Sequence, residues 1–230
     1  MIDTAMILAA GRGERMRPLT DTIPKPLLPV AGRSMLDRAI DRLAAHGVRR
    51  IVVNVHHLGA QIAAHLAGCA AIVYEDRLLE TGGSVKNALP LLGSGPFFVL
   101  NGDGLWSDGP APMLDRMADA WNPRDMDALL LLHPLETAVG RKAKDRGDYF
   151  LDAEGRACHR GDADRAPYLF ASISICDARL FRDSPEGPFS LLKLWTRAER
   201  TGRLHGLVHD GQWFHVGTPQ ALAEAENALA

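Results

Sequence analysis

Short apolar runs and amphipathic segments alternate along the first hundred residues of the chain. Residues 4–10 (TAMILAA) form a continuous apolar run that ends before Gly11, which is typical of a strand buried on both faces. Residues 34–47 carry apolar side chains at helical spacing, with Ser34 placed to cap the start and Gly47 to end the segment. This alternation predicts an α/β fold in which parallel strands are joined by right-handed crossovers.

The same patterns extend over the rest of the chain. Further strands are predicted at residues 50–55, 70–74, 96–101, 127–132, 168–176, 204–209 and 213–216. Further helices are predicted at residues 58–66, 83–89, 189–200 and 219–228. Because no internal repeat or linker is visible, we predict a single domain over residues 1–230, with a Rossmann-like, mostly parallel mixed sheet flanked by helices.

Two polar segments that contain glycine come at the ends of predicted strands. Gly11 and Gly13 follow the first strand, and the triplet 101–103 (Asn-Gly-Asp) ends the strand predicted at 96–101. The carboxyl ends of parallel strands meet at one edge of a sheet, where α/β proteins bind their ligands. We therefore expect both segments to face one crevice.

Composition narrows the possible functions. The 230 residues, 47% hydrophobic and 23% charged, suit a globular domain and not a disordered chain. Twenty-six basic against 28 acidic residues give a net charge of −2, which argues against a surface for nucleic acid or anionic membrane. The N-terminal apolar run is too short to span a bilayer and lacks a preceding basic segment, and the three cysteines show no CxxC spacing. We expect a cytoplasmic protein with reduced thiols, a monomer or weak homodimer.

The segment after the first strand concentrates features that suit an anion. Its cations Arg12, Arg15, Arg17 and Lys25 lie within fourteen residues of a chain that has only five lysines. Two glycines leave backbone N–H groups accessible, and three prolines stiffen the segment and are expected to hold Lys25 in an extended stretch. The P-loop pattern is absent, and the dinucleotide fingerprint fails because Met16 stands where its third glycine belongs. The segment predicts a polyphosphate site of another kind.

The stretch from residue 8 to residue 30, LAAGRGERMRPLTDTIPKPLLPV, resembles the signature of the sugar-1-phosphate nucleotidylyltransferases. The likeness continues in ETGGSVKNALPLL, FFVLNGD and WFHVGTPQALAEAE. These blocks have the order and spacing of the small bacterial N-acetylmuramate-1-phosphate uridylyltransferases of cell-wall recycling. The resemblance covers nearly the whole chain and is weakest in residues 137–165.

This resemblance implies a nucleotidyltransferase (GT-A-like) fold and an enzyme that passes a nucleotidyl group from a nucleoside triphosphate to a sugar 1-phosphate, releasing pyrophosphate. UTP with N-acetylmuramate 1-phosphate is the first expectation. Guanylyl, thymidylyl or uridylyl transfer to mannose or glucose 1-phosphate is the enzyme alternative, and a non-catalytic module that binds a nucleotide sugar is the alternative of another class. The resemblance also implies that residues 1–105 form the nucleotide-binding half and residues 106–230 the half that binds the sugar and completes the site.

The resemblance further implies roles for individual residues. Arg15 would hold the leaving pyrophosphate, Lys25 the α-phosphate and the incoming phosphate, and Asp103 a Mg²⁺ ion bound to the phosphates. The nucleotide would also contact Ala10, Gly11, Gly13, Glu80, Thr81 and Gly82. For Thr81 there is a second interpretation, because this residue could instead cap the helix predicted at residues 83–89.

The sugar side of the implied site rests on Asn101, Asp148 and Ser172. Asp148 matches a Gly-Asp-Phe segment of the family, whereas Ala171 and Ser172 stand where relatives have a Ser/Thr-Gly pair. The charge run at residues 141–146 either meets a carboxylate of the sugar or forms a solvated face.

His215 departs most from the family pattern, in which an aspartate at this position completes the metal site opposite Asp103. A neutral imidazole is a poor ligand for Mg²⁺ and a better one for softer divalent metals. Three interpretations stay open. Asp103, phosphates and water hold the metal alone; His215 binds directly and favours Mn²⁺ or Co²⁺; or the activity is reduced or replaced.

Overall fold

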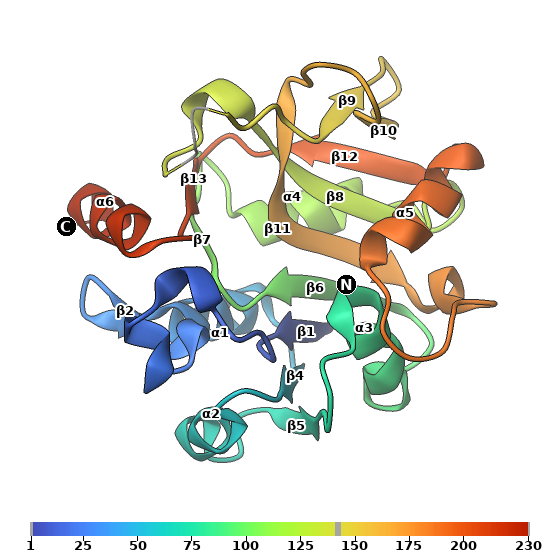
Figure 1. Ribbon diagram of the computed structural model, residues 1–230. Coiled ribbons are helices and arrows are strands. Elements are labelled where there is room, and N and C mark those ends of the chain that lie inside the picture. Colours follow the sequence, from blue (N-terminus) through green and yellow to red (C-terminus); the bar gives the residue numbers. More distant parts are fainter. Residues whose placement is uncertain (1, 141–143, 230) are drawn as a thin grey trace.

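A nine-stranded mixed sheet forms the centre of the computed structural model, which describes residues 2–140 and 144–229 (Figure 1). Its strands are β1 (Thr4–Leu8), β4 (Arg50–Val55), β5 (Ala71–Tyr74), β6 (Pro96–Asn101), β8 (Ala128–Pro134), β9 (Tyr149–Leu151), β10 (Ala157–His159), β11 (Tyr168–Asp177) and β12 (Leu204–Val208). Two further pairs lie outside it, namely β2 (Pro29–Val30) with β3 (Arg33–Ser34), and β7 (Gly104–Ser107) with β13 (Gln212–His215).

Parallel pairing dominates the part of the sheet built by the start of the chain. The strands β6, β1, β4 and β5 lie side by side in this order and run parallel. β11 joins β6 in the antiparallel direction, and β8 then pairs with β11 antiparallel and with β12 parallel. The predicted mixed sheet is confirmed.

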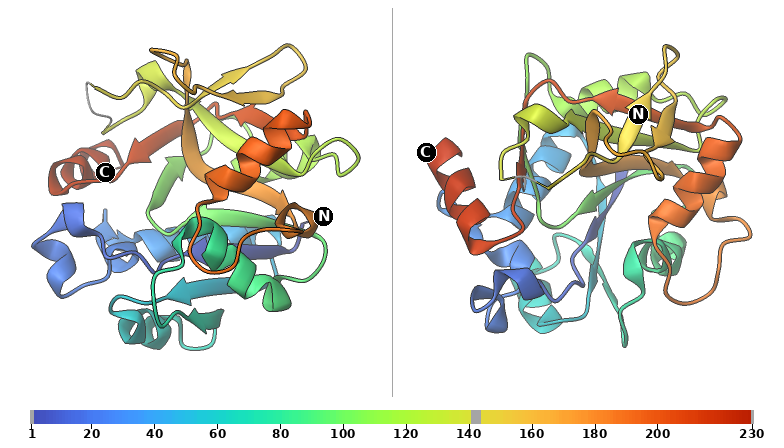
Figure 2. Two further views of the ribbon diagram at one scale, coloured as in Figure 1. Left: turned by 45° about the vertical axis from the view of Figure 1, so that its right-hand side comes forward. Right: turned by 45° about the horizontal axis from the view of Figure 1, so that its top comes forward.

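Helices cover both faces of the sheet. They are α1 (Met35–His46), α2 (Gly59–Leu66), α3 (Glu80–Leu92), α4 (Met113–Ala120), α5 (Leu191–Arg200) and α6 (Pro219–Leu229). α1, α2 and α4 share one buried cluster with Ile7, whereas α3 and α5 share another with Met6 and lie together on one side in Figure 2. Neighbouring side chains of β1 thus enter opposite layers, which explains its unbroken apolar run. No helix in the described ranges is long and apolar enough to cross a bilayer.

A third, smaller cluster joins the segment after β1 to the pair β7–β13. Met16 and Leu28 from that segment pack with Leu105 of β7 and Phe214 of β13, and Ala225 of α6 closes the cluster. All five residues are at most 3% exposed. This packing brings the N-terminal loop and the C-terminal strand to the same place in the molecule.

Most predicted elements are present, and the differences have physical reasons. The strands predicted at 50–55 and 96–101 agree with β4 and β6 to the residue. Ser34 caps α1 by accepting a hydrogen bond from the backbone N–H of Asp37 at 3.0 Å. The helix predicted at 83–89 begins earlier, at Glu80. The strands β9 and β10 were not predicted, because three residues each are too few to show a periodicity, and β7 and α4 were not predicted either.

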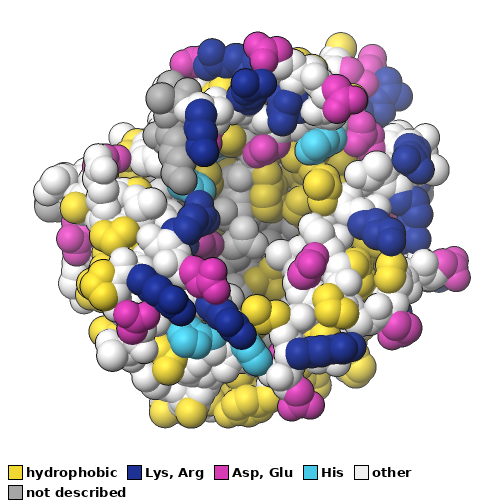
Figure 3. Space-filling model, in the orientation of Figure 1, with side chains coloured by type: hydrophobic (Ala, Val, Ile, Leu, Met, Phe, Trp, Pro, Cys, Tyr) yellow, Lys and Arg dark blue, Asp and Glu magenta, His cyan; other side chains and the backbone are white. Residues whose placement is uncertain are grey.

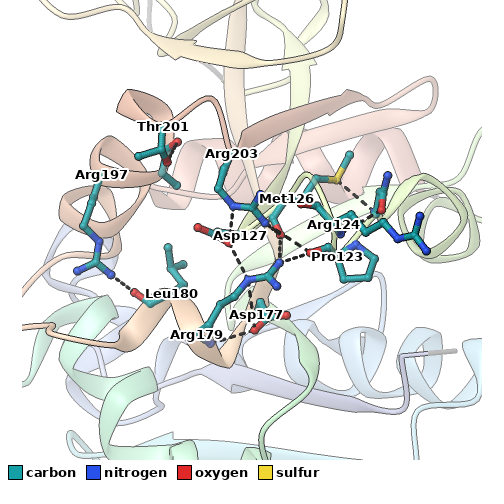
Figure 4. Close-up of polar contacts among 12 residues, drawn as sticks. Pro123, Arg124, Met126, Asp127, Asp177, Arg179, Leu180, Arg197, Thr201 and Arg203 are labelled. Atoms are coloured by element: carbon teal, nitrogen blue, oxygen red, sulfur yellow. Dashed lines mark hydrogen bonds and ion pairs between the residues drawn. The ribbon is translucent and has the colours of Figure 1, made fainter.

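In the second half of the chain, Asp127 lies between two arginines (Figure 4). Its Oδ1 accepts hydrogen bonds from Nε of Arg179 at 2.7 Å and from Nε of Arg203 at 2.9 Å. The same guanidinium groups donate to main-chain carbonyls of residues 123–126. These bonds tie the loop before β8 to the residues that follow β11 and precede β12.

Candidate active site

A cleft of about 710 Å³ opens where the chain leaves β1, β5 and β6. Figure 3 shows it as a hollow between two parts of the surface, with Lys and Arg side chains gathered along one rim. The predicted site residues among its lining are Ala10, Gly11, Gly13, Arg15, Lys25, Glu80, Thr81, Asn101 and Asp103. The expectation that the two glycine-containing segments face one crevice is confirmed.

Close packing shapes the loop after β1. Gly13 has a left-handed backbone, with φ 62°, and its carbonyl accepts a hydrogen bond from the Thr20 hydroxyl at 2.9 Å. A Cβ at Gly13 would lie 2.9 Å from the Thr20 methyl group and 3.1 Å from Cβ of Lys25. A Cβ at Gly11, in contrast, would meet no described atom within 4 Å. Gly13 is therefore needed for the shape of the loop, whereas Gly11 leaves room for a ligand.

Lys25 lies below this loop and is only 9% exposed. Its ammonium group contacts a carboxylate oxygen of Asp103, which ends the turn after β6. The prediction of an extended stretch at Lys25 is wrong, because Lys25–Leu27 form a 3-10 turn that begins after the extended Pro24. Pro26 occupies a first-turn position whose N–H needs no partner, so the prolines stiffen a turn and not a strand.

The other cations of the loop differ in how they are paired. Nε of Arg17 lies 3.2 Å from a carboxylate oxygen of Asp21, so its charge is compensated on the surface. Arg12 and Arg15 line the cleft, and neither has a carboxylate partner in the part of the chain that the structure describes. Together with the accessible amides of Gly11 and Gly13, they make this wall of the cleft positive.

The pair β7–β13 places His215 beside Asp103. In this antiparallel pair His215 lies opposite Gly104, the residue that follows Asp103. Gly217 lines the cleft, and a Cβ there would come within 2.6 Å of Nε2 of His215. Burial lowers the pKa of His215, and the nearby Arg15 lowers this pKa further. The imidazole is therefore neutral at pH 7, and His215 lies behind Gly217 without being a lining residue of the cleft.

The turn expected to contact the nucleobase is the first turn of α3. Glu80 and Thr81 line the cleft, and Glu80 has a left-handed backbone with φ 58°. The capping interpretation of Thr81 is wrong, because Leu79 occupies the cap position. The Thr81 hydroxyl instead accepts a hydrogen bond from the backbone N–H of Leu191, at 2.9 Å.

Gly82 lies next to this turn but is not among the residues that line the cleft. It is buried, and a Cβ there would lie 2.4 Å from the ring of Phe189. The absent side chain therefore makes room for Phe189.

A buried polar chain below the cleft was not predicted. The side chain of Asn54, 1% exposed, accepts a hydrogen bond from the N–H of Ala9 at 2.9 Å and donates one to Glu75 at 2.8 Å. The second carboxylate oxygen of Glu75 accepts the N–H of Leu79 at 3.2 Å. Both side chains line the cleft and connect the end of β1 to the start of α3. The available signal was a polar residue inside the apolar run of β4.

Of the three residues predicted for the sugar, Asn101 and Ser172 both lie close to Gly104, whereas Asp148 lies at the far side of β11 from β6. Asn101 lines the cleft. Ser172 has φ 66° at an irregularity of β11, and its Cβ lies 3.3 Å from where a side chain at Gly104 would begin. The carboxylate of Asp148 accepts the backbone N–H of Phe170 at 2.9 Å, so it braces β11. Neither Ser172 nor Asp148 is a lining residue of the cleft.

The predicted charge run at 141–146 is only partly described, since Arg141, Lys142 and Ala143 lie outside the described residues. Arg146 pairs with the exposed Asp164, with 2.9 Å between Nη1 and Oδ1. For Arg146 this favours the solvated face over a contact with the sugar.

Asp103 is the lining carboxylate that the resemblance assigns to a divalent cation. Within residues 2–140 and 144–229, no group of three or more His, Cys, Asp or Glu side chains could hold an ion by itself. The Asp103 side chain is 35% exposed, and Lys25 contacts only one of its oxygens. Mg²⁺ in phosphate sites takes one or two carboxylates and completes its shell with phosphate and water oxygens. The residues present therefore fit a cation that arrives with phosphates.

The positive loop, the contact of the buried Lys25 with Asp103 and the cleft at the strand ends point to phosphoryl-group chemistry, and comparison with known proteins agrees. Residues 5–151 match the model of the MobA-like NTP transferase domain, and the chain belongs to this family. It is therefore a nucleotidyltransferase, as the sequence resemblance implied.

Two relatives align over nearly their whole length. The chain is 43% identical to an N-acetylmuramate alpha-1-phosphate uridylyltransferase from Caulobacter vibrioides, over 98% of the chain and 96% of the relative. It is 37% identical to a protein of the same name from Neisseria meningitidis serogroup B, over 98% and 97% of the two chains. The crystal structure of HddC from Yersinia pseudotuberculosis with GMP-PN superposes with a TM-score of 0.79 at 21% identity and covers 100% of both chains, which supports the fold.

Proposed function

We propose that this chain transfers a uridylyl group from UTP to N-acetylmuramate α-1-phosphate and releases pyrophosphate. The full-length similarity to two relatives named for this reaction supports the choice of substrates. The observation that carries the reaction type is the buried ammonium group of Lys25, held against Asp103 in a cleft that Arg12 and Arg15 also line.

The proposed reaction needs positioning and charge neutralisation. An oxygen of the sugar 1-phosphate bonds to the α-phosphorus of UTP while the bond from that phosphorus to the α–β bridging oxygen breaks. The bridging oxygen leaves with the β- and γ-phosphates as pyrophosphate. Because the attacking phosphate is already an anion, no general base is required, and fixed positive groups stabilise the charge that develops.

The residues of the cleft divide this task. Lys25 neutralises the α-phosphate and the incoming phosphate, and Arg15 holds the leaving pyrophosphate. The amides of residues 10–13 (Ala-Gly-Arg-Gly) wrap the triphosphate, since Gly11 offers no side chain to obstruct it. The main chain of the Glu80–Thr81 turn contacts the base, since the Thr81 hydroxyl is taken by the N–H of Leu191.

The sugar is proposed to lie on the side of Asn101 and Ser172. Asn101 is in the lining, and Ser172 stands next to the turn that carries Asp103. In this proposal Asp148 acts indirectly: its hydrogen bond to Phe170 holds β11, the strand on which Ser172 lies.

Asp103 is the residue that would hold a Mg²⁺ ion. Such an ion would act as a Lewis acid and neutralise charge on the phosphate oxygens. His215 either stays outside the metal shell or adds a nitrogen ligand, which would favour Mn²⁺ or Co²⁺. We also propose that the enzyme acts in the cytoplasm, in the reuse of cell-wall sugars, and its three free cysteines suit a reducing compartment.

A screen of pyrophosphate release tests the proposal. UTP, GTP, CTP and dTTP are each combined with the 1-phosphates of N-acetylmuramate, mannose and glucose, with Mg²⁺ and Mn²⁺ in separate series. We expect the highest kcat/KM for UTP with N-acetylmuramate 1-phosphate. A higher value for mannose or glucose 1-phosphate would replace the proposed acceptor. No release with any pair, together with retained binding of a nucleotide sugar, would favour the non-catalytic module.

A further inference from the structure

Residues 184–191, here called the strap, lie in the second half of the chain and are hydrogen-bonded to α3 in the first half. The strap follows the short helix Ala178–Phe181 and leads into α5. It runs beside α3 in Figure 1, and both views of Figure 2 keep the two segments together. Glu80 and Thr81 in the first turn of α3 line the cleft, and the strap contacts this same turn.

Main-chain hydrogen bonds join the strap to the first turn of α3. The N–H of Phe189 donates to the carbonyl of Leu79 at 3.1 Å. Its carbonyl accepts the N–H groups of Gly82 and Gly83 at 2.8 and 3.0 Å. The first N–H groups of a helix have no partner within the helix, and side chains usually supply one. Here the strap takes that place.

The strap can lie this close to α3 only because residues 82 and 83 of the helix carry no side chain. A Cβ at Gly82 would lie 2.4 Å from the ring of Phe189, and a Cβ at Gly83 would lie 2.4 Å from the carbonyl oxygen of Gly187. Phe189 itself is only 6% exposed. The two adjacent glycines of ETGGS therefore provide a docking surface for the strap.

Lys86 anchors the other end of the strap. Its ammonium group donates to the carbonyls of Ser184 and Pro185, both at 3.0 Å, and contacts a carboxylate oxygen of Glu186 at 2.6 Å. Lys86 is not among the residues that line the cleft. Any effect of Lys86 on a ligand in the cleft must therefore pass through the strap or through α3.

The residue between these contacts has an unusual backbone. Glu80 has φ 58°, a conformation that costs free energy for a residue with a side chain and persists where neighbouring contacts hold it. The strap binds Leu79 on one side of Glu80 and Gly82 on the other. It also donates the N–H of Leu191 to the hydroxyl of Thr81.

We infer that the strap positions the Glu80–Thr81 turn for the nucleotide, with Lys86 and the Thr81 hydroxyl as its positioning residues. Loosening the strap weakens nucleotide binding and leaves the transfer step unchanged, because Lys25 and Asp103 lie on other elements. The inference rests on the proposed function in one respect, namely that this turn contacts the base.

Binding of UTP alone, measured by calorimetry with Mg²⁺ present, tests the inference. Lys86→Met removes all three anchoring contacts, and Lys193→Met, on the exposed side of α5, is the matched control. We expect the Kd for UTP to rise about tenfold in Lys86→Met and to stay at the wild-type value in Lys193→Met. The KM for UTP should rise with the Kd, and kcat should stay within about twofold of wild type.

A second pair of variants keeps the test open if Lys86→Met does not fold. Thr81→Val loses the acceptor for Leu191, whereas Thr81→Ser keeps it. Hydrogen exchange of the Leu191 amide should accelerate in Thr81→Val alone, and UTP binding should weaken in that variant and recover in Thr81→Ser.

Two results would overturn the inference. One is an unchanged Kd for UTP in Lys86→Met, whether or not hydrogen exchange at Gly82 and Gly83 has accelerated. The other is a loss of kcat with an unchanged KM. UTP binding needs no acceptor sugar, so the two proposals can fail separately. A protein that binds UTP but releases no pyrophosphate with any pair in the screen would contradict the proposed function without contradicting this inference.

Discussion

Two regions of this molecule set basic side chains against an aspartate, and they do so in opposite ways. Around Asp127, the guanidinium groups of Arg179 and Arg203 share one carboxylate and donate their remaining hydrogen bonds to carbonyls of the preceding loop (Figure 4). At the cleft, Lys25 contacts Asp103, but Arg15 beside them has no carboxylate partner within the described residues.

The difference shows why counting charges does not locate a site. An arginine whose donors are taken by carbonyls and a carboxylate stabilises a loop and has little left for a ligand. An unpaired arginine in a cleft keeps its donors for phosphate oxygens. The net charge of −2 counts both kinds of arginine in the same way and so does not distinguish them.

Removing the cleft pair is expected to have the largest effect. Lys25→Ala and Asp103→Asn should each reduce kcat at least about 100-fold, because each removes a group that stabilises charge in the transition state. Pyrophosphate release at saturating substrates measures kcat, and circular dichroism verifies that the variants fold. A near-normal rate in either variant would contradict the role assigned to that residue.

Breaking the other region should change stability and leave catalysis intact. Asp127→Asn removes the charge between two arginines at a side chain that is 20% exposed. We expect the free energy of unfolding to fall by about 1–3 kcal/mol. Urea unfolding measures this loss, and kcat/KM should stay within about twofold of wild type. A variant as stable as wild type but slow would remove the distinction between the two regions.

A pair of buried histidines provides a third arrangement, in which the effect of burial on the pKa exceeds that of nearby charges. His133 and His209 are each 2% exposed, with ring centroids 5.8 Å apart. Burial lowers the pKa of both imidazoles. The unfolded chain binds protons as the pH falls through about 6.5, whereas the folded chain resists them.

The contribution of these two histidines to the free energy of unfolding is therefore expected to be complete above about pH 6.5. It should decrease as the pH falls below that value, with a slope that approaches about 1.4 kcal/mol per pH unit for each histidine. Urea unfolding between about pH 7.5 and pH 5.5 measures the slope, above the range in which most carboxylates titrate. His133→Gln should show a shallower decline. An equal slope in wild type and variant would mean that His133 does not contribute.

The smallest expected effect is a gain at the edge of the cleft. His215→Asp should raise turnover with Mg²⁺ roughly three- to tenfold and lower the preference for Mn²⁺, because a carboxylate suits a hard cation better than an imidazole does. Parallel assays with the two metals give the ratio. An unchanged ratio would place residue 215 outside the metal shell.

Prediction from the sequence worked best where one periodicity covers a whole element. β4 and β6 agree with their predicted bounds because both are apolar runs between polar residues. Thr81 shows the opposite case: threonine before a helix is a common cap, but the partner of its hydroxyl is Leu191, 110 positions away along the chain. Gly82 likewise makes room for Phe189, a contact that no local pattern reveals.

The sequence by itself determined a polyphosphate site, because Gly11, Gly13, Arg15 and Lys25 lie close together in one segment, and its resemblance to the sugar-1-phosphate nucleotidylyltransferases implied the reaction class. The tertiary structure alone decided which of these groups are available. Contacts between distant residues bury Lys25 against Asp103, bring His215 next to the cleft through the pairing of β7 with β13, and place the strap behind Glu80. Such contacts depend on the packing of the whole chain, whereas local composition records only which chemistry is present.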